Sequence, residues 1–586
     1  MKNKWLSLDF ETNTANKYSA QIVCLGWCEF DLSGHIYDKG ILGFGPVNKK
    51  KLPPLRERNV IMHGSDFDLF LLNREEHQLD KAHDTLLMAK HWRNDLPSYS
   101  LKALSWYLFG ELYLELSTLE QWFRDRGEST DDESDFDMSA PPPDLVGRYC
   151  LKDVEMTAKL ACWLYPKVQD NYAYQQDIEF NPINIEIQSN GITVDKKFLR
   201  RFVKNGKQRI KRRTSDADTR MREAGVLEGN KKPTGDAVRT YLGNLGETRR
   251  TLKSRKILAN EVVFRSYEKD KIIQDISIIK SVQKEVNTYA KNLLTACGKT
   301  DRFHPNLVMS AAITRRFRSW SLYGDAGQIT RGQVQNFPRG HGIRDSIIVP
   351  PGFVFGKLDL ASIEARLGAH LMAVFLKEFW FCNQYKANDS FNIYLHVVKT
   401  CTGNGEITKK DHLYQAYKHG CLGIQYGVGS KTFYVTMHDK FNLPVTENEC
   451  FQIYANINRQ FPVFKALQRV VSALVEKQGF LLDDFGAIYY VPKEERYKGV
   501  NYLSQGGAGN VFKWWILEVN KILKPPDYMF NLVHDEVDMA ISLKDGKKKA
   551  EERTQQYCDT LKNLDGFLSL PIRAEWSLGN NWAEVG

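Results

Sequence analysis

The sequence contains no run of about 18 consecutive apolar residues, which is the length that a membrane-spanning helix requires. Its first residues, MKNKWLSLDF, include no apolar signal region and no arginine-rich amphipathic leader, and they pass directly into a strand-like pattern. These absences argue against an integral membrane protein and against an exported one. We therefore expect a cytoplasmic protein with no membrane partner.

Metal-binding and redox motifs of the cysteine type are also missing. The sequence has no CxxC pair, and no cysteine has a histidine at the spacing of a zinc site. The ten cysteines are scattered along the chain: Cys24, Cys28, Cys150, Cys162, Cys297, Cys382, Cys401, Cys421, Cys450 and Cys558. We expect them to be buried, reduced thiols.

One long segment lacks acidic residues altogether. From Lys196 to Arg213 there are ten lysines or arginines and no aspartate or glutamate, although the whole chain has a formal charge of only +10. Such a run is either a solvated helix face or a surface that contacts phosphate groups. Neighbouring motifs are needed to decide between the two.

The chain of 586 residues is too long for one hydrophobic core, so we expect several domains. Short apolar strands alternate with helical patterns up to about residue 170, which predicts an α/β domain that is interrupted by the acidic, proline-rich loop 127–144. A charge-rich helical region follows over residues 171–300. Residues 301–586 mix strands, long helices and glycine turns, and predict a second, larger globular unit.

Three acidic motifs follow one another in the N-terminal part. Asp9 and Glu11 are two residues apart at the end of an apolar strand, so their side chains leave the same face. Asp68 follows a strand that stops at the His-Gly of HGSDFD, and Tyr149 and Asp153 are four residues apart on one helix face. Like charges brought together cost free energy unless a cation joins them.

In this order, DxE, HGxxFD and YxxxD resemble the three motifs of the DnaQ-like 3′ to 5′ exonucleases, which have an RNase H fold. The resemblance implies that Asp9, Glu11, Asp68 and Asp153 hold two Mg²⁺ ions, with Mn²⁺ as a substitute, and that Tyr149 orients the attacking water. Many proofreading relatives have asparagine where this chain has Gly64. The His-Gly pair is similar to the RNase D-like branch, which leaves the preferred nuclease substrate open.

Two further acidic sites end apolar strands in the larger unit. Asp359 ends the strand FVFGKLDL and is followed at once by a helix, while Asp535 and Glu536 lie in NLVHDEVD, which predicts a tight hairpin. A carboxylate at a buried strand end is costly when unpaired, and a shared pair of divalent cations would compensate both sites. Phosphoryl transfer uses such an arrangement.

A helix-face pattern lies between these two sites. Lys418, Leu422 and Tyr426 follow one another at intervals of four residues, so they share one face of a helix. Such a stripe alone is more often core packing than a binding site. Together with the two carboxylate segments, it resembles motif B of the family A DNA polymerases, between motifs A (Asp359 to Arg366) and C (His534 to Glu536).

The resemblance extends over nearly the whole chain, including the segments QVQNFP (333–338), NYLSQG (501–506) and the C-terminal stretch from Pro571 to Trp582. It implies an α/β multidomain fold: an RNase H-like domain (1–170), a linker and helical thumb (171–300), and a palm with fingers (301–586, with the fingers at about 375–485). Asp359 and Asp535 would hold two Mg²⁺ ions, with Glu536 beside them. Nucleotide contacts are implied at Lys418, Leu422, Tyr426 and Glu364, and DNA contacts at Arg316, Gln335, Asn336, Asn501, Gln505 and His534.

Within that resemblance, Glu364 occupies the sugar-gate position beside the nucleotide C2′, and Lys418 meets the triphosphate. The DNA-contacting residues would read the minor groove, where correct base pairs present similar acceptors. The basic run 196–213 then falls in the thumb, so we favour the interpretation that it contacts phosphates.

The chain departs from the family pattern mainly where the nucleotide is held. Leu422 replaces an aromatic residue that influences acceptance of chain terminators, and Tyr414 stands where an arginine is usual. Phe391 occupies the histidine position of a DxH motif. An arginine expected before Asn501 is displaced by one residue to Arg496, with Tyr497 in its register. We therefore expect an unusual grip on the incoming nucleotide.

These patterns predict a template-directed DNA polymerase with a proofreading 3′ to 5′ exonuclease, acting on primer-template DNA and dNTPs. The exonuclease motifs begin almost at residue 1 and the thumb region is short, which resembles bacteriophage replicative enzymes. A phage origin would place the protein in the host-cell cytoplasm, with replisome proteins such as helicase–primase and single-strand binding protein as partners. Three alternatives stay open: a single-subunit RNA polymerase, a nuclease with a weakened polymerase half that only binds nucleic acid, and a structural duplex-binding protein.

Overall fold

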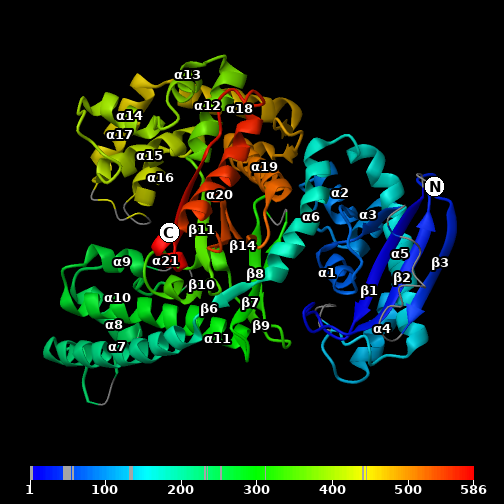
Figure 1. Ribbon diagram of the computed structural model, residues 1–586. Helices are drawn as coiled ribbons and strands as arrows, with labels where there is room; N and C mark the ends of the chain where they lie inside the picture. Colours follow the sequence, from blue (N-terminus) through cyan, green and yellow to red (C-terminus); the bar gives the residue numbers. More distant parts are fainter. Residues whose placement is uncertain are drawn as a thin grey trace.

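The computed structural model describes the chain from residue 4 to residue 586, apart from short gaps (Figure 1). The gaps are residues 44–54, 56, 57, 131–135, 230, 231, 234, 251–253, 310, 311, 438–440, 442 and 444, together with the side chain of Val262. The most acidic part of the predicted 127–144 loop thus lies outside the described residues.

A mixed sheet of five strands, in the order β3-β2-β1-β4-β5, forms the N-terminal part. Its strands are β1 (Trp5–Thr12), β2 (Ile22–Phe30), β3 (Ile36–Gly43), β4 (Asn59–Met62) and β5 (His83–Asp84). Strands β1 to β3 are antiparallel neighbours, whereas β4 runs parallel to β1 and β5 runs parallel to β4. The parallel pairs require crossovers, and helices supply them.

Helices pack around this sheet, and the longest one lies against β1 and β2. They are α1 (Asp66–Arg74), α2 (Thr85–Trp92), α3 (Leu101–Phe109), α4 (Leu114–Arg124) and α5 (Pro143–Val168). Helix α3 ends at Phe109, because the next residue, Gly110, has a φ of 67° and provides a left-handed C-cap.

Helix α6 (Tyr172–Asn190) leaves the N-terminal part and packs against both α19 and strand β14 of the larger unit (Figure 1). The predicted domain boundary at residue 170 falls in the short connection between α5 and α6. The helical region that follows contains α7 (Lys196–Glu223), α8 (Gly235–Asn244), α9 (Glu261–Ser266), α10 (Lys271–Lys284), the π-helical segment η2 (Glu285–Ala290) and α11 (Lys291–Cys297).

Helix α7 carries the basic run, and most of its charged side chains are solvent-exposed. The exposed members are Lys197, Arg200, Arg201, Lys204, Lys207, Arg209, Lys211 and Arg212. Lys196 differs, because it is buried and donates to the carbonyl oxygens of Gly298 and Thr300. Arg213 pairs with Asp275 of α10 at 2.7 Å. The two ends of the run therefore fix the helix, and its middle forms an exposed cationic face.

Two more sheets build the larger unit. One has the order β10-β6-β7-β8-β9, with β6 (Ile192–Val194), β7 (Arg302–Val308), β8 (Arg318–Tyr323), β9 (Ile329–Arg331) and β10 (Ile347–Ile348). The other is antiparallel, in the order β14-β15-β11-β16, with β11 (Phe353–Leu360), β14 (Tyr528–Val533), β15 (Glu536–Ser542) and β16 (Ala574–Gly579). Only His534 and Asp535 connect β14 to β15, so the predicted tight hairpin is confirmed.

Helices surround the antiparallel sheet and form a separate group at one end (Figure 1). Helices α20 (Lys547–Asp559) and α21 (Trp582–Val585) pack against this sheet, and α12 (Ile363–Leu376) and α19 (Gly499–Ile522) pack against each other. The group contains α13 (Trp380–Ala387), α14 (Ile393–Thr402), α15 (His412–Gln425), α16 (Ser430–Val435), α17 (Glu447–Gln460) and α18 (Val463–Gln478), followed by the hairpin β12 (Phe480–Leu482) and β13 (Ile488–Tyr490). Short 3₁₀ turns cover Val334–Asn336, Ile343–Ser346, Lys493–Lys498 and Thr560–Leu564.

Two sequence expectations concern the whole molecule. All ten cysteines are free thiols, and they are buried except for the half-buried Cys162 and Cys401. Among the described residues, no helix combines the length and apolar character needed to cross a membrane.

Candidate functional site: two carboxylate centres

The first centre gathers the N-terminal acids at the end of β1. Asp9 and Glu11 lie on this strand, and the carboxylate of Asp68, near the start of α1, accepts a hydrogen bond of 3.2 Å from the Phe10 backbone N–H. Helix α5 contributes Asp153, whose negative charge adds to the effect of burial in raising the pKa values of Asp9 and Glu11. The structure therefore brings together all four predicted exonuclease carboxylates.

The loop before α1 is held by an acid that the sequence motifs do not include. Asp84 accepts hydrogen bonds from the backbone N–H groups of Gly64 at 3.0 Å and Ser65 at 2.8 Å. Gly64 has a φ of 69°, in the left-handed region that glycine adopts freely and asparagine tolerates. This backbone conformation is therefore compatible with glycine and with the asparagine that the exonuclease resemblance leads us to expect.

A lysine that sequence reasoning missed lies at the same centre. The ammonium of Lys102, on α3, is 2.7 Å from the Tyr149 hydroxyl and 3.1 Å from Asp153. It lowers the pKa values of Asp9 and Glu11, although other effects outweigh it. No local motif marks Lys102, because its partners are about fifty residues away in sequence.

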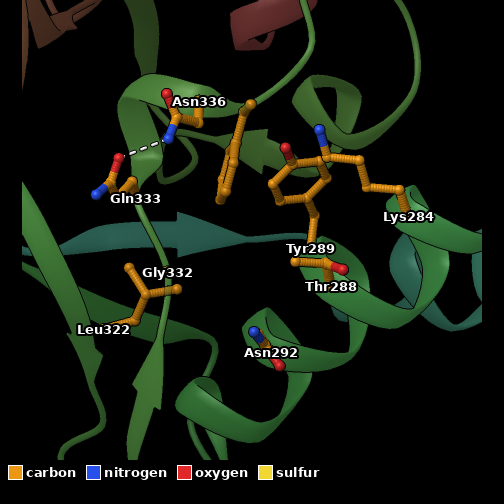
Figure 2. Close-up of a pocket in the computed structure, with 9 residues that line it drawn as sticks. Lys284, Thr288, Tyr289, Asn292, Leu322, Gly332, Gln333 and Asn336 are labelled. Carbon is orange, nitrogen blue, oxygen red and sulfur yellow. Dashed lines mark hydrogen bonds between the residues drawn. The ribbon is translucent and has the colours of Figure 1, made fainter. Parts of the chain in front are cut away.

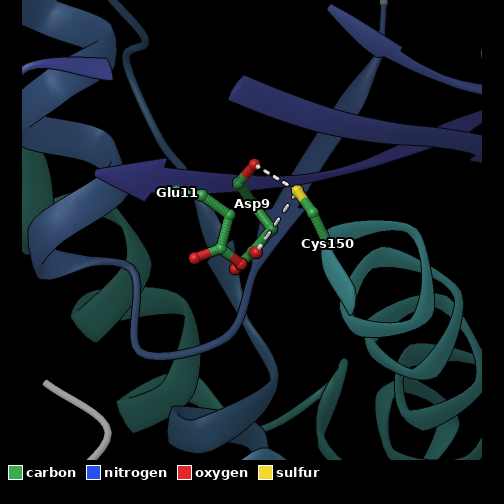
Figure 3. Close-up of side chains that lie close together, drawn as sticks. All are labelled: Asp9, Glu11 and Cys150. Carbon is green, nitrogen blue, oxygen red and sulfur yellow. Dashed lines mark hydrogen bonds between the residues drawn. The ribbon is translucent and has the colours of Figure 1, made fainter. Parts of the chain in front are cut away.

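Cys150 also reaches the first centre (Figure 3). Its sulfur lies 3.6 Å from the Asp9 carbonyl oxygen and 3.8 Å from an Asp9 carboxylate oxygen, and it forms a compact group with Asp9 and Glu11. The close approach of α5 to the sheet depends on Gly26 of β2, where an added Cβ would lie 2.7 Å from this sulfur. The centre thus contains one soft ligand atom beside hard carboxylate oxygens.

The pKa values of these acids are displaced upward. Burial, followed by repulsion from Asp153, raises the pKa of Asp9 to about 7. Burial and the charge of Asp9 also raise the pKa values of Glu11 and Asp68 well above their ordinary range. Such clustered carboxyl groups favour a bound cation over the fully ionised, metal-free state.

The second centre lies at one end of the antiparallel sheet. Asp359 is near the end of β11, and Asp535 is in the turn between β14 and β15. The Leu360 backbone N–H donates to the Asp535 carbonyl oxygen at 3.1 Å, which sets the two segments side by side. His534 completes the turn with a φ of 59°. A two-residue hairpin turn commonly needs such a left-handed backbone.

An ion pair lies beside these aspartates. Arg316 donates to Glu364, at the start of α12, at 3.0 Å. The charge of Arg316 lowers the pKa of Asp535, although burial keeps that pKa above its ordinary value. Burial raises the pKa of Tyr426, and the negative charge of Glu364 raises it further. The structure therefore joins Arg316, Glu364, Tyr426 and Asp535 in one cluster.

Glu536 is directed into the protein beneath the aspartates. It is buried, accepts a hydrogen bond of 2.9 Å from the indole N–H of Trp582, and lies 3.2 Å from the Lys357 ammonium. The same ammonium is 3.9 Å from Asp359. Lys357 is two residues before Asp359 on the strand, so the alternation of the strand places both on one face.

Asp359 has a displaced pKa similar to that of Asp9. Desolvation by the surrounding protein, followed by repulsion from Asp535, raises its pKa to about 7, and Lys357 opposes the shift. Carboxylate oxygens are the ligands that Mg²⁺ and Mn²⁺ prefer, so both centres have donor sets suited to these ions.

Two residues that depart from the family pattern have partners inside the protein. Tyr414, where an arginine was expected, is buried, and its hydroxyl lies 3.2 Å from the side-chain nitrogen of Asn392. Phe391 packs among the rings of Trp380, Tyr385 and His396. Neither side chain has a charge to offer a phosphate group.

Other predicted nucleotide and DNA contacts lie on two helices of the larger unit. Lys418 and Leu422 are half-buried on α15, and in the described part of the chain no hydrogen bond or ion pair forms at the Lys418 ammonium. Asn501 and Gln505 lie on α19, both half-buried. Helix α15 ends at Gln425, so Tyr426 is its C-cap residue.

Asn336, which follows Gln335 in the chain, lies beside a cavity of about 510 Å³ (Figure 2). Asn336 lines it, with Gln333 bonded to the Asn336 side chain, and the opposite wall comes from Lys284, Thr288 and Asn292 around the π-helical segment. π-helical turns inside helices are frequent at functional sites. The cavity therefore sets polar groups from the helical region opposite a predicted DNA-binding segment.

The architecture that carries the second centre is that of a polymerase domain. A solved structure described as the POL domain of Pol1 from M. smegmatis, in complex with DNA primer-template and dNTP, matches 99% of this chain and 96% of that chain with a TM-score of 0.74. The sequence identity is 16%, so this match shows a shared fold. The model of DNA polymerase family A matches residues 199–584, and the chain belongs to that family.

Three curated proteins that are similar to this chain are all described as DNA polymerase I. DNA polymerase I of Helicobacter pylori is 25% identical over 332 residues, which cover 52% of this chain and 33% of the relative. DNA polymerase I of Borreliella burgdorferi is 19% identical across 100% of this chain and 63% of the relative, and that of Pseudomonas aeruginosa is 22% identical across 86% and 54%. The chain thus spans between 33% and 63% of the length of these relatives.

Proposed function

We propose that this protein is a template-directed DNA polymerase that also removes nucleotides from a 3′ end. What supports the proposal is the presence of two separate carboxylate centres, one in the family A unit and one on the N-terminal sheet. Each has an aspartate whose pKa is raised to about 7, as expected for metal ligands without their metal.

In the polymerase centre, Asp359 and Asp535 would hold two Mg²⁺ or Mn²⁺ ions, which would activate the primer 3′-OH and neutralise the triphosphate. Glu536 and Lys357 hold the Asp359 strand end in place from below. Glu364, fixed by Arg316, would exclude a ribose 2′-OH, and Lys418 would attract the triphosphate. Arg316, Gln335, Asn336, Asn501, Gln505 and His534 would contact primer-template DNA.

In the N-terminal centre, Asp9, Glu11, Asp68 and Asp153 would hold the ions for hydrolysis of the terminal phosphodiester. Lys102 fixes the hydroxyl of Tyr149, which would orient the attacking water. The order of strands in the sheet, three antiparallel and then two parallel, is the one expected of an RNase H-like exonuclease domain.

One experiment tests both halves. A labelled primer-template is incubated with Mg²⁺, with and without dNTPs, using the wild type, Asp9→Ala and Asp535→Ala. We expect Asp9→Ala to abolish shortening only and Asp535→Ala to abolish extension only. The exposed Asp170→Ala serves as a matched control and should do neither. Any other partition would contradict the assignment of the two centres.

The same assay separates the competing functions. Preferential use of rNTPs would indicate an RNA polymerase, and shortening without extension by the wild type would indicate a nuclease with a binding module. A structural duplex-binding protein would bind the substrate and change it in neither direction. Replication of a bacteriophage genome with helicase–primase and single-strand binding protein is part of the proposal.

A further inference from the structure

A fully buried charged junction joins the N-terminal part to the polymerase unit. His91 of α2 and Asp177 of α6 meet Arg315, which precedes β8, and Lys513 of α19. Asp177 and Lys513 are 0% exposed, His91 is 1% exposed and Arg315 is 6% exposed. We call these four residues the α6 junction.

The contacts of the α6 junction are short and converge on one carboxylate. Asp177 lies 2.5 Å from the guanidinium of Arg315, 2.7 Å from the ammonium of Lys513 and 2.9 Å from His91 Nε2. The guanidinium is also 2.7 Å from His91 Nε2 and donates to the Asn510 side chain at 3.1 Å. Arg315 is thereby held on several sides.

The α6 junction contains two cations, one anion and a neutral histidine. Burial alone would raise the pKa of Asp177, but Arg315 and Lys513 outweigh it and hold that pKa well below the ordinary value. Burial, then Arg315, lowers the pKa of His91 to about 4, so the imidazole is neutral at pH 7. Asp177 therefore balances two buried cations, and breaking such a pair is strongly destabilising.

Arg315 has a strained backbone at this point. Its φ is 59°, which is uncommon for a residue with a long side chain and persists only where the surroundings impose it. The next residue is Arg316, whose guanidinium bonds Glu364 and acts on Asp535. The side chain of Arg315 is anchored on the N-terminal part, while Arg316 points into the polymerase centre.

We propose that His91 and Asp177 are positioning residues for nucleotide addition. By fixing Arg315 in its left-handed conformation they set Arg316 against Glu364, so a residue of the N-terminal part determines how the polymerase centre holds its nucleotide. This inference rests on the proposed polymerase function. It is separate from the exonuclease centre, because none of the four junction residues belongs to that centre.

The test compares two buried histidines of the N-terminal part. His91→Leu removes the contact with Arg315 while leaving Asp177 paired with both cations. The matched control is His83→Leu, because His83 is also buried and bonds α6, through the Tyr174 hydroxyl at 2.8 Å, but does not contact Arg315. The conservative His91→Gln keeps a side-chain acceptor, its amide oxygen, for the Arg315 guanidinium.

The measurements are kcat and KM for dNTP in primer extension, and the rate of shortening of single-stranded DNA. We expect His91→Leu to raise KM for dNTP on the order of 10-fold with shortening unchanged, His91→Gln to restore most of the affinity, and His83→Leu to leave KM unchanged. Equal effects of the two leucine variants on KM would overturn the proposal, as would a parallel loss of extension and shortening in His91→Leu.

Hydrogen exchange gives a readout that does not depend on catalysis. Backbone amides of residues 312–318 should exchange faster in His91→Leu than in the wild type or His83→Leu. If the wild type extends no primer, the proposed function fails while this comparison still tests the junction. Unchanged exchange in His91→Leu would show that the N-terminal part does not hold Arg315.

Discussion

Two carboxyl groups make the stability of this protein depend on pH. Asp9 and Asp359 have folded pKa values of about 7, against about 3.9 in an unfolded chain. Between these values the metal-free folded protein binds more protons than the unfolded chain. Its free energy of unfolding should therefore fall as pH rises from about 4 to about 7 and level off above that.

A bound cation needs the ionised carboxylates, so the effect of Mg²⁺ on stability should follow the opposite trend. We expect Mg²⁺ to raise Tm more at about pH 8 than at about pH 6, measured by thermal unfolding. The double variant Asp9→Asn, Asp359→Asn should lose most of this difference. An equal Mg²⁺ effect at both pH values in the wild type would contradict the assignment of these acids as ligands.

Leu422 gives a prediction about nucleotide choice. It is half-buried on α15, four residues after Lys418, at the position where the motif B resemblance leads us to expect an aromatic ring. Leu422→Tyr should change the preference for dNTP over ddNTP on the order of 10-fold, because the ring would pack against the sugar. Competition assays measure this ratio, and an unchanged ratio would remove Leu422 from the nucleotide site.

The places of acidic residues in the fold were predictable where a local sequence pattern marks them. Asp359 and Asp535 end apolar strands, and their neighbours along the chain reveal the turn and helix around them. Lys102 and Arg315 carry no such mark, because their partners lie far away in sequence and only packing brings them together. Lys357 is an intermediate case. The alternation of side chains along β11 predicts that it shares a face with Asp359, but not that it contacts Glu536.

The position of a whole helix determines where its site residues lie, and α5 is the clearest example. Its approach to β2 is close enough that a methyl group on Gly26 would lie 3.1 Å from the Cys150 carbonyl oxygen as well as 2.7 Å from its sulfur. Gly26→Ala should displace the helix segment that carries Tyr149 and Asp153. We expect a loss of about 1–3 kcal/mol in the free energy of unfolding.

The functional result of Gly26→Ala should be confined to one centre. Shortening of a 3′ end should fall well below the wild-type rate, while primer extension stays near normal. Gly43→Ala, in the neighbouring strand β3, is the control, because an added Cβ there meets nothing within 4 Å. Equal loss of both activities in Gly26→Ala would point to global unfolding instead.

The exposed face of α7 should contribute to DNA affinity through charge alone. Arg200, Lys204, Lys207 and Lys211 follow one another at intervals of three or four residues and are all exposed. Replacing all four by glutamine should weaken duplex binding and reduce the slope of log K against log salt by up to about 0.9 for each DNA phosphate that the helix no longer neutralises. Lys547→Gln with Lys548→Gln on α20 is the control. A slope equal to that of the wild type would favour a merely solvated helix face.

Element types were easier to predict than element ends. The β14–β15 hairpin and the strand-to-helix passage at Asp359 are confirmed, because apolar runs and their acidic ends define them. The end of α3 depends on one residue, since Gly110 ends the helix by a left-handed turn. The placement of Lys196 in the exposed basic face was wrong, because backbone carbonyls of Gly298 and Thr300 bind its ammonium.

At the scale of the whole molecule, the two parts of the chain are joined by buried polar contacts. Besides the α6 junction, Gln176 donates to the Asn510 carbonyl oxygen at 3.0 Å, and Asn184 donates to that of Leu307 at 2.9 Å. Sequence patterns predict α/β parts on both sides of α6. They do not predict this joint, because it depends on pairs of residues that lie more than a hundred positions apart.

Helix α6 also limits how the two proposed activities can be studied apart. The family match begins at residue 199, which invites expression of a shorter polymerase fragment from that point. Such a fragment would keep Arg315 and Lys513 but lose Asp177, leaving two interior cations without their anion. A polymerase fragment that begins at residue 199 would therefore lack a counterion in its interior, whereas point substitutions at either carboxylate centre leave that counterion in place.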